Sequence, residues 1–187
     1  MRGMRGWLVA LLLVLGGAWA EPDYYPHALG LAWVYDSGEE QVFVEERELD
    51  GQRVWVLEHR FSGKARYADV VRYGEDGVWL LGIVLDGEFK PYDPPIQLYP
   101  PAPLWVGREW GSRSSLDGQR VVVVARVLRV EGVTVPAGRF NAFVIRGSLT
   151  TESGGSRVMD TYFVPGVGVV RFATQDGGAI DLIDLRR

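Results

Sequence analysis

The sequence predicts an all-β protein, an antiparallel up-and-down meander that forms a strongly curved sheet, clam or barrel, with a proline-rich crossover loop. Turn signals recur at short intervals, and Asp-Gly alone occurs at 50–51, 76–77, 86–87, 117–118 and 176–177. Asp-Gly readily adopts the positive φ that two-residue hairpin loops require. The segments between the turns are rich in Val, Ile, Leu and aromatic residues, which favour strands. After the first 20 residues, no window has the apolar spacing of an amphipathic helix.

The turn spacing predicts eleven strands. Further breaks are expected at Ser37-Gly38, Ser62-Gly63 and Glu131-Gly132. Because every connection is short, strands that are neighbours in sequence should pair. The expected strands lie at 31–36, 40–49, 52–61, 65–73, 77–85, 108–116, 119–131, 140–151, 156–164, 167–174 and 179–185.

Two of these strands are apolar on both faces. In 77–85, Trp79, Leu81 and Ile83 alternate with Val78 and Leu80, and the run 121–125 is apolar without a break. We expect both faces of these strands to be hidden from water. The sheet should therefore curl into a barrel or clam, pack on a second sheet, or be covered by a loop.

Residues 90–106 are the candidate cover, because they combine six prolines with Tyr92, Leu98, Tyr99 and Trp105. Proline cannot donate a ladder hydrogen bond, so this segment is not expected to be a central strand. Two interpretations stay open: a crossover packed permanently over the sheet, or a lid over a ligand cavity.

The N-terminus has the order of a secretory signal. Arg2 and Arg5 precede an apolar run at 7–15, and Ala18-Trp19-Ala20 follows as a cleavage site. The run is shorter than the ~20 apolar residues of a membrane span, and no later stretch could cross a bilayer as a helix. We expect residues 1–20 to be removed near Ala20, leaving 21–187 as a single β domain that is periplasmic or secreted.

Composition excludes several classes of function. Without Arg2 and Arg5, 18 basic residues face 24 acidic ones, a net charge of −6, which argues against a nucleic-acid partner. The absence of cysteine excludes disulfides, thiolate sites and a lipidated cysteine. Two histidines leave little for a metal site, and no cofactor motif is present.

No catalytic constellation is visible, so we expect a protein that is not an enzyme. His27 and His59 would need a serine and a carboxylate from elsewhere in the fold to form a triad. His59 shares a strand face with Trp55 and Leu57, which favours a buried, hydrogen-bonded role. Asp69 lies on a partly apolar face and must pair if it is buried; Arg66, Arg72 or an arginine from a neighbouring strand is the expected partner.

Four segments, taken in order, resemble a group of uncharacterised exported bacterial β proteins. They are 25–35 (YPHALGLAWVY), 106–110 (VGREW), 133–140 (VTVPAGRF) and 162–170 (YFVPGVGVV). The group is distantly similar to curved-sheet envelope proteins of the LolA/LolB type, which implies a concave antiparallel sheet able to hold acyl chains. This chain lacks the lipidated cysteine of LolB, and only the proline-rich segment could replace the covering helices of those carriers. The 135–138 and 165–168 segments also fit simple turns between strands.

The leading functional hypothesis is an exported, non-enzymatic envelope protein with an apolar site for a hydrophobic small molecule or lipid. The alternative is a solid-cored module that acts through contacts with another envelope protein. A hydrolase with dispersed carboxylates is a third, weaker hypothesis. The candidate ligand-binding residues are Trp33, Trp55, Trp79, Leu81 and Ile83 in the wall, and Tyr92, Tyr99 and Trp105 in the proline-rich segment.

Overall fold

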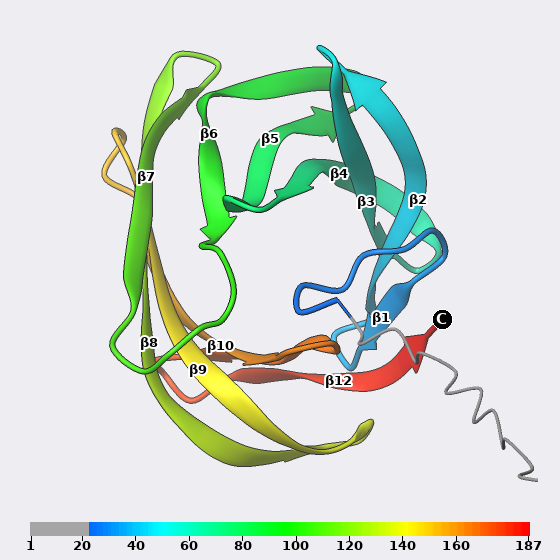
Figure 1. Cartoon of the computed structure of the whole chain (residues 1–187), viewed down its shortest axis with the longest axis vertical. Helices are drawn as coiled ribbons and strands as arrows, with labels where there is room; N and C mark the ends of the chain where they lie inside the picture. Colours follow the sequence, from blue (N-terminus) through cyan, green and yellow to red (C-terminus); the bar gives the residue numbers. More distant parts are fainter. Residues whose placement is uncertain (1–22) are drawn as a thin grey trace, which may run out of the picture.

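The strands form a closed antiparallel barrel (Figure 1). The computed structural model describes residues 23–187; the predicted signal peptide lies outside the described residues. Consecutive strands pair all the way round, and β1 pairs with β12 to close the ring. The predicted fold class is confirmed. The strands are β1 (Ala32–Tyr35), β2 (Glu39–Leu49), β3 (Gln52–Phe61), β4 (Lys64–Gly74), β5 (Gly77–Leu85), β6 (Glu88–Tyr99), β7 (Glu109–Leu116), β8 (Gln119–Val135), β9 (Gly138–Thr151), β10 (Ser156–Val164), β11 (Gly168–Thr174) and β12 (Ala179–Arg186).

The hairpin turns follow the sequence signals. Asp50-Gly51, Ser62-Gly63, Asp86-Gly87 and Asp117-Gly118 have positive φ at both residues. This conformation matches the twist of the flanking strands, so short loops can join them. The bounds of β3, β5 and β10 agree with the predicted ones. In the described part of the chain, no helix is long and apolar enough to span a membrane.

The expected break at Glu131-Gly132 is wrong. Residues 131–132 lie inside β8, which continues to Val135 and pairs with β9 as far as Gly138. Gly132 pairs with Asn141 in this register. Val133 and Val135 beyond it are buried in the core, and their burial outweighs the weak strand propensity of one glycine.

Residues 88–99 correct the expectation that the proline-rich segment is not a central strand, because they form β6, which lies between β5 and β7. The prolines stand where β6 needs few backbone donors. Pairing with β5 runs from Glu88 to Pro91, is interrupted, and resumes at Ile96. Pro94 and Pro95 fall in the interruption, so the missing N–H groups remove no ladder bond there. Only the remaining residues of the proline-rich segment, 100–106, form a loop.

The β6–β7 contact is closed by side chains more than by backbone. Only Asp93 and Ser115 form a backbone bridge between these strands. The Ser112 hydroxyl accepts a hydrogen bond of 2.8 Å from the Gln97 N–H, and the Ser114 hydroxyl donates one of 2.6 Å to the Pro94 carbonyl. Serine hydroxyls thus satisfy backbone groups that the irregular β6 leaves without a ladder partner.

The expectation that both faces of 121–125 are hidden is wrong for β8. Val122 and Val124 are 38% and 49% exposed on the outside of the barrel, while Val121 and Ala125 are buried. Scattered apolar side chains are common on protein surfaces. In β5, the inner Val78 and Leu80 are buried, and Trp79 lies below the Arg72 guanidinium, 5.9 Å from its ring centre.

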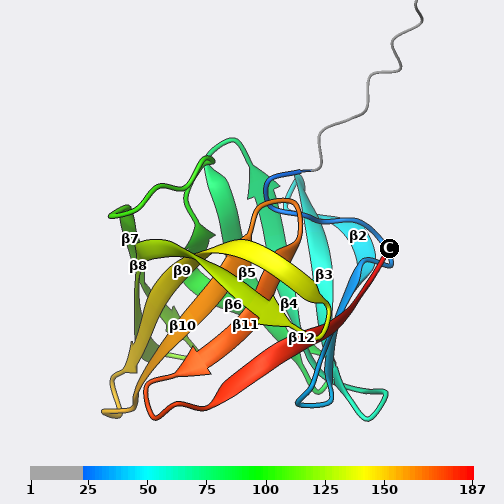
Figure 2. The same ribbon diagram turned by 90° about the horizontal axis from the view of Figure 1, so that it is seen from below.

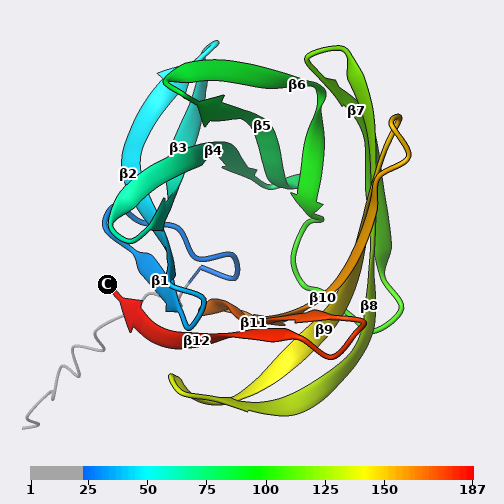
Figure 3. The same ribbon diagram turned by 180° about the vertical axis from the view of Figure 1, so that it is seen from behind.

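Two segments close one end of the ring. Figure 2 shows the segment before β1 and the segment after β6 at the same end of the barrel. In Figure 3, both turn inward across the ring of strands. We name residues 23–31 the N-terminal segment and residues 100–108 the β6–β7 loop.

Candidate functional site

A cavity of about 400 Å³ lies inside the barrel. Its lining is mainly aromatic and aliphatic, with a polar group at His59 and Asp69. A volume of this size is within the ~300–1,000 Å³ range of small-molecule sites. The lining includes Tyr25, Trp33, Tyr35, Phe43, Leu57, Val71, Tyr73, Val78, Leu98, Tyr99, Trp110, Ala125, Ile145, Gly147, Met159, Phe163 and Phe172.

Small residues on β8 and β9 leave this space open. The register places Trp110, Ala125, Gly147 and Met159 in one row across four strands, and all four line the cavity. Paired residues of antiparallel strands share a face, so Gly147 faces inward. A Cβ built on Gly147 meets no atom closer than the Met159 carbonyl oxygen at 3.9 Å.

The N-terminal segment seals one end of the cavity with aromatic rings. The Tyr25 ring stacks on Tyr99 at 5.0 Å and lies 5.5 Å from Phe163. Its hydroxyl donates a hydrogen bond of 2.8 Å to the Pro100 carbonyl. The Tyr24 hydroxyl accepts one of 2.9 Å from the Leu104 N–H. The segment is thereby attached to both the wall and the β6–β7 loop.

The β6–β7 loop is held in place rather than free. Leu104 is buried in a core cluster with Phe163. The Arg108 guanidinium donates to the Pro101 and Pro103 carbonyls at 2.7 and 2.8 Å, and it lies 4.1 Å from the Trp105 ring centre. These contacts support the fixed-crossover interpretation over the lid.

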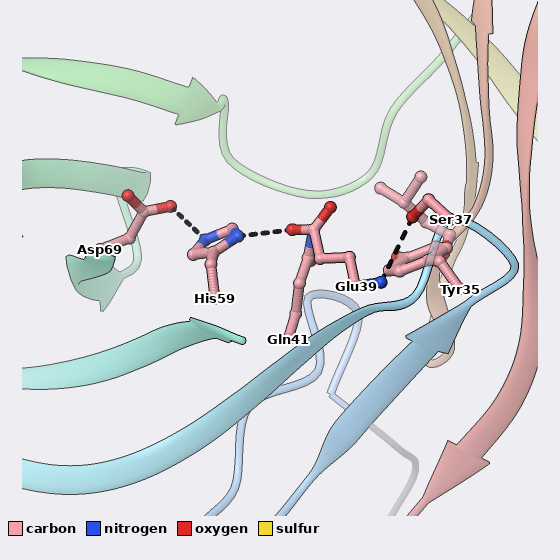
Figure 4. A network of polar contacts seen from close by, with 7 residues as sticks. Tyr35, Ser37, Glu39, Gln41, His59 and Asp69 are labelled. Carbon is pink, nitrogen blue, oxygen red and sulfur yellow. Dashed lines mark hydrogen bonds and ion pairs between the residues drawn. The ribbon is translucent and has the colours of Figure 1, made fainter. Parts of the chain in front are cut away.

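A charged cluster lies on the inner face of β2, β3 and β4 (Figure 4). The buried His59 bonds through Nδ1 to Glu39 Oε1 at 2.7 Å and through Nε2 to Asp69 Oδ2 at 3.1 Å. Gln41 donates to the same Glu39 oxygen at 3.0 Å. The Tyr67 ring stacks on the imidazole at 4.2 Å.

The two carboxylates keep His59 charged. Burial alone would lower the pKa of His59, but the hydrogen bonds to Asp69 and Glu39 raise it to about 9. Burial opposes ionisation of Glu39, yet its hydrogen bonds with His59 and Gln41 lower its pKa. At neutral pH the cluster therefore holds one imidazolium and two carboxylates, a net charge of −1.

This arrangement corrects the expected partner of Asp69, which is His59 and not Arg66, Arg72 or another arginine from a neighbouring strand. Arg72 instead pairs with Asp76 at 2.7 Å. The prediction that His59 is buried and hydrogen-bonded is confirmed. With both ring nitrogens donating to carboxylates, the imidazolium has no free lone pair to act as a base. Within residues 23–187, no group of three His, Asp or Glu side chains could hold a metal ion.

The predicted ligand-binding residues are not all brought together. Trp33 and Tyr99 line the cavity, and the Trp33 indole N–H is fixed by a hydrogen bond of 2.7 Å to the Val167 carbonyl. Trp55 packs behind the lining, 5.9 Å from Phe43. Ile83 pairs with Asp69 but is not in the lining.

Trp79, Leu81 and Tyr92 line a second hollow of about 700 Å³, which lies beside the β2–β3 turn, β6 and β7. Its charged residues include Arg72 and Asp76, which neutralise each other. Trp105 is 54% exposed, lies under Arg108 and lines neither hollow. The cavity inside the barrel has the more apolar lining and is therefore the better candidate site for a hydrophobic ligand.

Sequence reasoning missed several lining residues, among them Phe43, Phe163 and Tyr73. The alternation in 65–73 does place Tyr67, Val71 and Tyr73 on one face, so part of the signal was present. What alternation cannot show is which face lines a cavity. Register shifts at Phe43/Glu45, Val70/Val71 and Leu80/Gly82 change the facing of the side chains beyond them.

No protein-family model and no curated protein matches this sequence significantly. Two solved structures are similar in shape. One is a candidate exported protein with a YmcC-like fold from Bacteroides fragilis NCTC 9343, with 12% identity, a TM-score of 0.49, and coverage of 89% of this chain and 100% of its own. The other is a candidate lipoprotein from Parabacteroides distasonis ATCC 8503, with 15% identity, a TM-score of 0.44, and coverage of 88% and 99%. At these TM-scores, neither likeness carries information about function, and the similarity to LolA/LolB-type carriers stays a prediction.

Proposed function

We propose that this protein is an exported, non-enzymatic binding protein whose barrel cavity holds a hydrophobic small molecule or the chain of a lipid. The observation that carries the proposal is the cavity of about 400 Å³ inside the barrel, which is lined mainly by aromatic and aliphatic side chains. Apolar surface that faces an internal space gains free energy when an apolar ligand covers it. The fixed ring of strands around the cavity supplies a preformed site.

Binding is favoured over contact with a protein partner by the same observation. A solid-cored module would fill its interior with its own side chains, whereas Ala125 and Gly147 leave space at the centre of this one. Catalysis is not favoured, because His59 is occupied at both nitrogens.

A neutral fluorescent probe tests the proposal directly. N-phenyl-1-naphthylamine should bind the purified protein saturably, with one probe per chain and enhanced emission. In Gly147→Phe the new ring points into the cavity and should reduce probe affinity at least about tenfold, because it occupies the volume that the probe needs. Thermal unfolding and circular dichroism of the variant establish that the barrel still forms.

Gly132→Phe is the matched control, because Gly132 is exposed on β8 and a Cβ there meets only the Asn141 amide oxygen at 3.8 Å. This variant should bind the probe as the unmodified protein does. Absence of saturable binding, or equal binding by Gly147→Phe with an intact fold, would overturn the proposal in favour of the solid-cored module.

Export is the second part of the proposal, with a periplasmic or secreted location after cleavage near Ala20. It rests on the charged, apolar and small-residue order of residues 1–20. The intact mass of the protein isolated from the cell envelope or medium should correspond to a chain that begins at Glu21. Recovery of the full-length chain in the cytoplasm alone would contradict it.

A further inference from the structure

Two tyrosine hydroxyls inside the barrel have no hydrogen-bond partner among the described residues, and this observation points to the polar part of a ligand. Tyr73 and Tyr99 are surrounded by protein, yet both keep some exposed surface and both line the cavity. Burial raises the pKa of both phenols, so each keeps its O–H donor at physiological pH.

The unpaired Tyr73 and Tyr99 hydroxyls are not fully buried, since the fully buried side-chain atoms without a partner among the described residues are Arg47 Nε and Trp79 Nε1. An accessible hydroxyl in a mainly apolar space gains a hydrogen bond when a ligand supplies an acceptor. The neighbouring Tyr25 and Tyr35 hydroxyls both donate to backbone carbonyls, of Pro100 and Val169. The contrast indicates that Tyr73 and Tyr99 are available to a molecule in the cavity.

The charged cluster supplies the complementary acceptors. Asp69 uses one carboxylate oxygen for His59, and its other oxygen has no protein partner within residues 23–187. Figure 4 shows the second oxygens of Asp69 and Glu39 turned away from the imidazole. Asp69 also contributes to the raised pKa of Tyr73, after burial and Tyr99, because its charge acts on the same part of the cavity.

The negative charge of the cluster disfavours an anionic head group. In the described chain, His59 is the only basic residue in the cavity lining, and it is already shared by two carboxylates. Arg157 acts on Tyr67, but its own side chain is exposed at the surface. An anionic head group would therefore meet a net charge of −1 with no free cation in a region of low dielectric.

We propose that the ligand of this cavity is a single-chain amphiphile whose head group is not anionic and donates hydrogen bonds through a hydroxyl or an amine. This inference rests on the proposed binding function. The apolar lining takes the chain, and the free oxygen of Asp69 accepts a hydrogen bond from the hydroxyl or ammonium of the head group. Where the head group carries an oxygen, the Tyr73 and Tyr99 hydroxyls donate to it. A space of about 400 Å³, at ~30 Å³ for each water-sized group, holds roughly a dozen such groups, which suits a chain of about ten carbons.

Chain-matched competitors test the head group. Monodecanoylglycerol, decylamine and decanoate would each be titrated against bound N-phenyl-1-naphthylamine at pH 7, below their micelle concentrations. We expect the glycerol ester and the amine to displace the probe at concentrations at least about tenfold lower than decanoate. Comparing the affinity of the ester with that of the amine then shows whether the cavity prefers a hydroxyl or an ammonium head group.

Asp69→Asn isolates the charge. The amide oxygen of the new side chain can still accept a hydrogen bond from His59 Nε2–H, while the net charge of the cluster changes from −1 to zero. The concentration of decanoate needed to displace the probe should then exceed that of the ester or the amine by less than about threefold. Asp160→Asn is the control, because Asp160 pairs with Arg146 outside the cavity. It should leave the preference unchanged. Tyr73→Phe should weaken binding of the glycerol ester several-fold and have little effect on binding of the probe.

The outcomes separate the two proposals. If the probe binds but decanoate competes as well as the ester and the amine, the head-group inference is wrong while binding in the cavity stands. A preference that survives unchanged in Asp69→Asn would also overturn it. If neither the probe nor any competitor binds, the proposed function itself fails, and the inference with it.

Discussion

The Ser114 hydroxyl on β7 donates a hydrogen bond of 2.6 Å to the carbonyl oxygen of Pro94 on β6. Ser114 is buried, with 7% of its surface exposed. This contact stands where a regular barrel would have backbone ladder bonds, since only Asp93 and Ser115 form a bridge between the two strands. The closure of the barrel at this point therefore depends on serine side chains.

Ser114→Ala should destabilise the barrel by about 1–3 kcal/mol, because it leaves the buried Pro94 carbonyl without its partner. Urea unfolding measures the loss, and hydrogen exchange should show faster opening in β6 and β7 than elsewhere. Ser115→Ala is the control, because its hydroxyl bonds to Asp93 at 3.2 Å in an exposed position and should cost less than about 0.5 kcal/mol. Equal effects of the two changes would contradict this account of the closure.

His59 should make stability depend on pH in the alkaline range. Its pKa rises from 6.5 to about 9 on folding, so its contribution is fully present below pH 6.5 and is lost as the pH rises through about 9. The free energy of unfolding should fall by as much as about 3 kcal/mol across this window, and His59→Gln should remove that slope. Urea titrations at pH 6, 7.5 and 9 give the free energy of unfolding of both proteins. The same dependence of this free energy on pH in both would refute the role of His59.

Glu39 should act in the acid range with the opposite sign. Its pKa is lowered from 4.5 on folding, so its contribution is present above pH 4.5 and is lost as the pH falls through the lower, folded value. In Glu39→Gln, acid unfolding below pH 4.5 should therefore be shallower than in the unmodified protein. The tryptophan fluorescence of both proteins, followed from pH 6 to pH 2, provides the comparison.

Tyr24→Phe should loosen the β6–β7 loop. The change removes the acceptor of the Leu104 N–H, and a lost buried hydrogen bond of about 1–3 kcal/mol corresponds to a roughly 5- to 150-fold faster opening. Hydrogen exchange of the Leu104 amide measures this rate. Tyr92→Phe serves as the control, because the Tyr92 hydroxyl makes no hydrogen bond to the loop in residues 23–187. An unchanged Leu104 rate would show that the loop is held without Tyr24.

Gly77→Ala should be much more damaging than Gly87→Ala, although both glycines have positive φ, of 109° and 82°. A Cβ at Gly77 would overlap the Tyr99 carbonyl oxygen, whereas a Cβ at Gly87 meets no atom within 4 Å. Both variants carry the backbone strain of a left-handed residue, and Gly77→Ala adds an overlap of about 1–3 kcal/mol. The melting temperatures of the two variants test the difference; similar values would contradict it.

The sequence by itself determined the strands and the hairpins. Asp50-Gly51 and Asp117-Gly118 adopt the positive φ that their residue types favour, and the β-branched and aromatic segments between such turns form strands close to the predicted bounds. These features depend on interactions between residues near in sequence, so composition and spacing suffice to predict them. The failure at 88–99 has a local cause too, because the sequence does not show where β6 can do without backbone donors.

The tertiary structure decided which face of each strand borders the cavity and which groups meet there. Leu80 and Ile83 are three residues apart, yet they pair with Val71 and Asp69 on the same side, because a register shift lies between Leu80 and Gly82. Trp79 and Leu81 line another hollow. His59 meets Glu39, 20 residues away, and Asp69, 10 residues away. A shift of one residue reverses every side chain beyond it, and such shifts result from packing across the whole barrel rather than from the residues next to them.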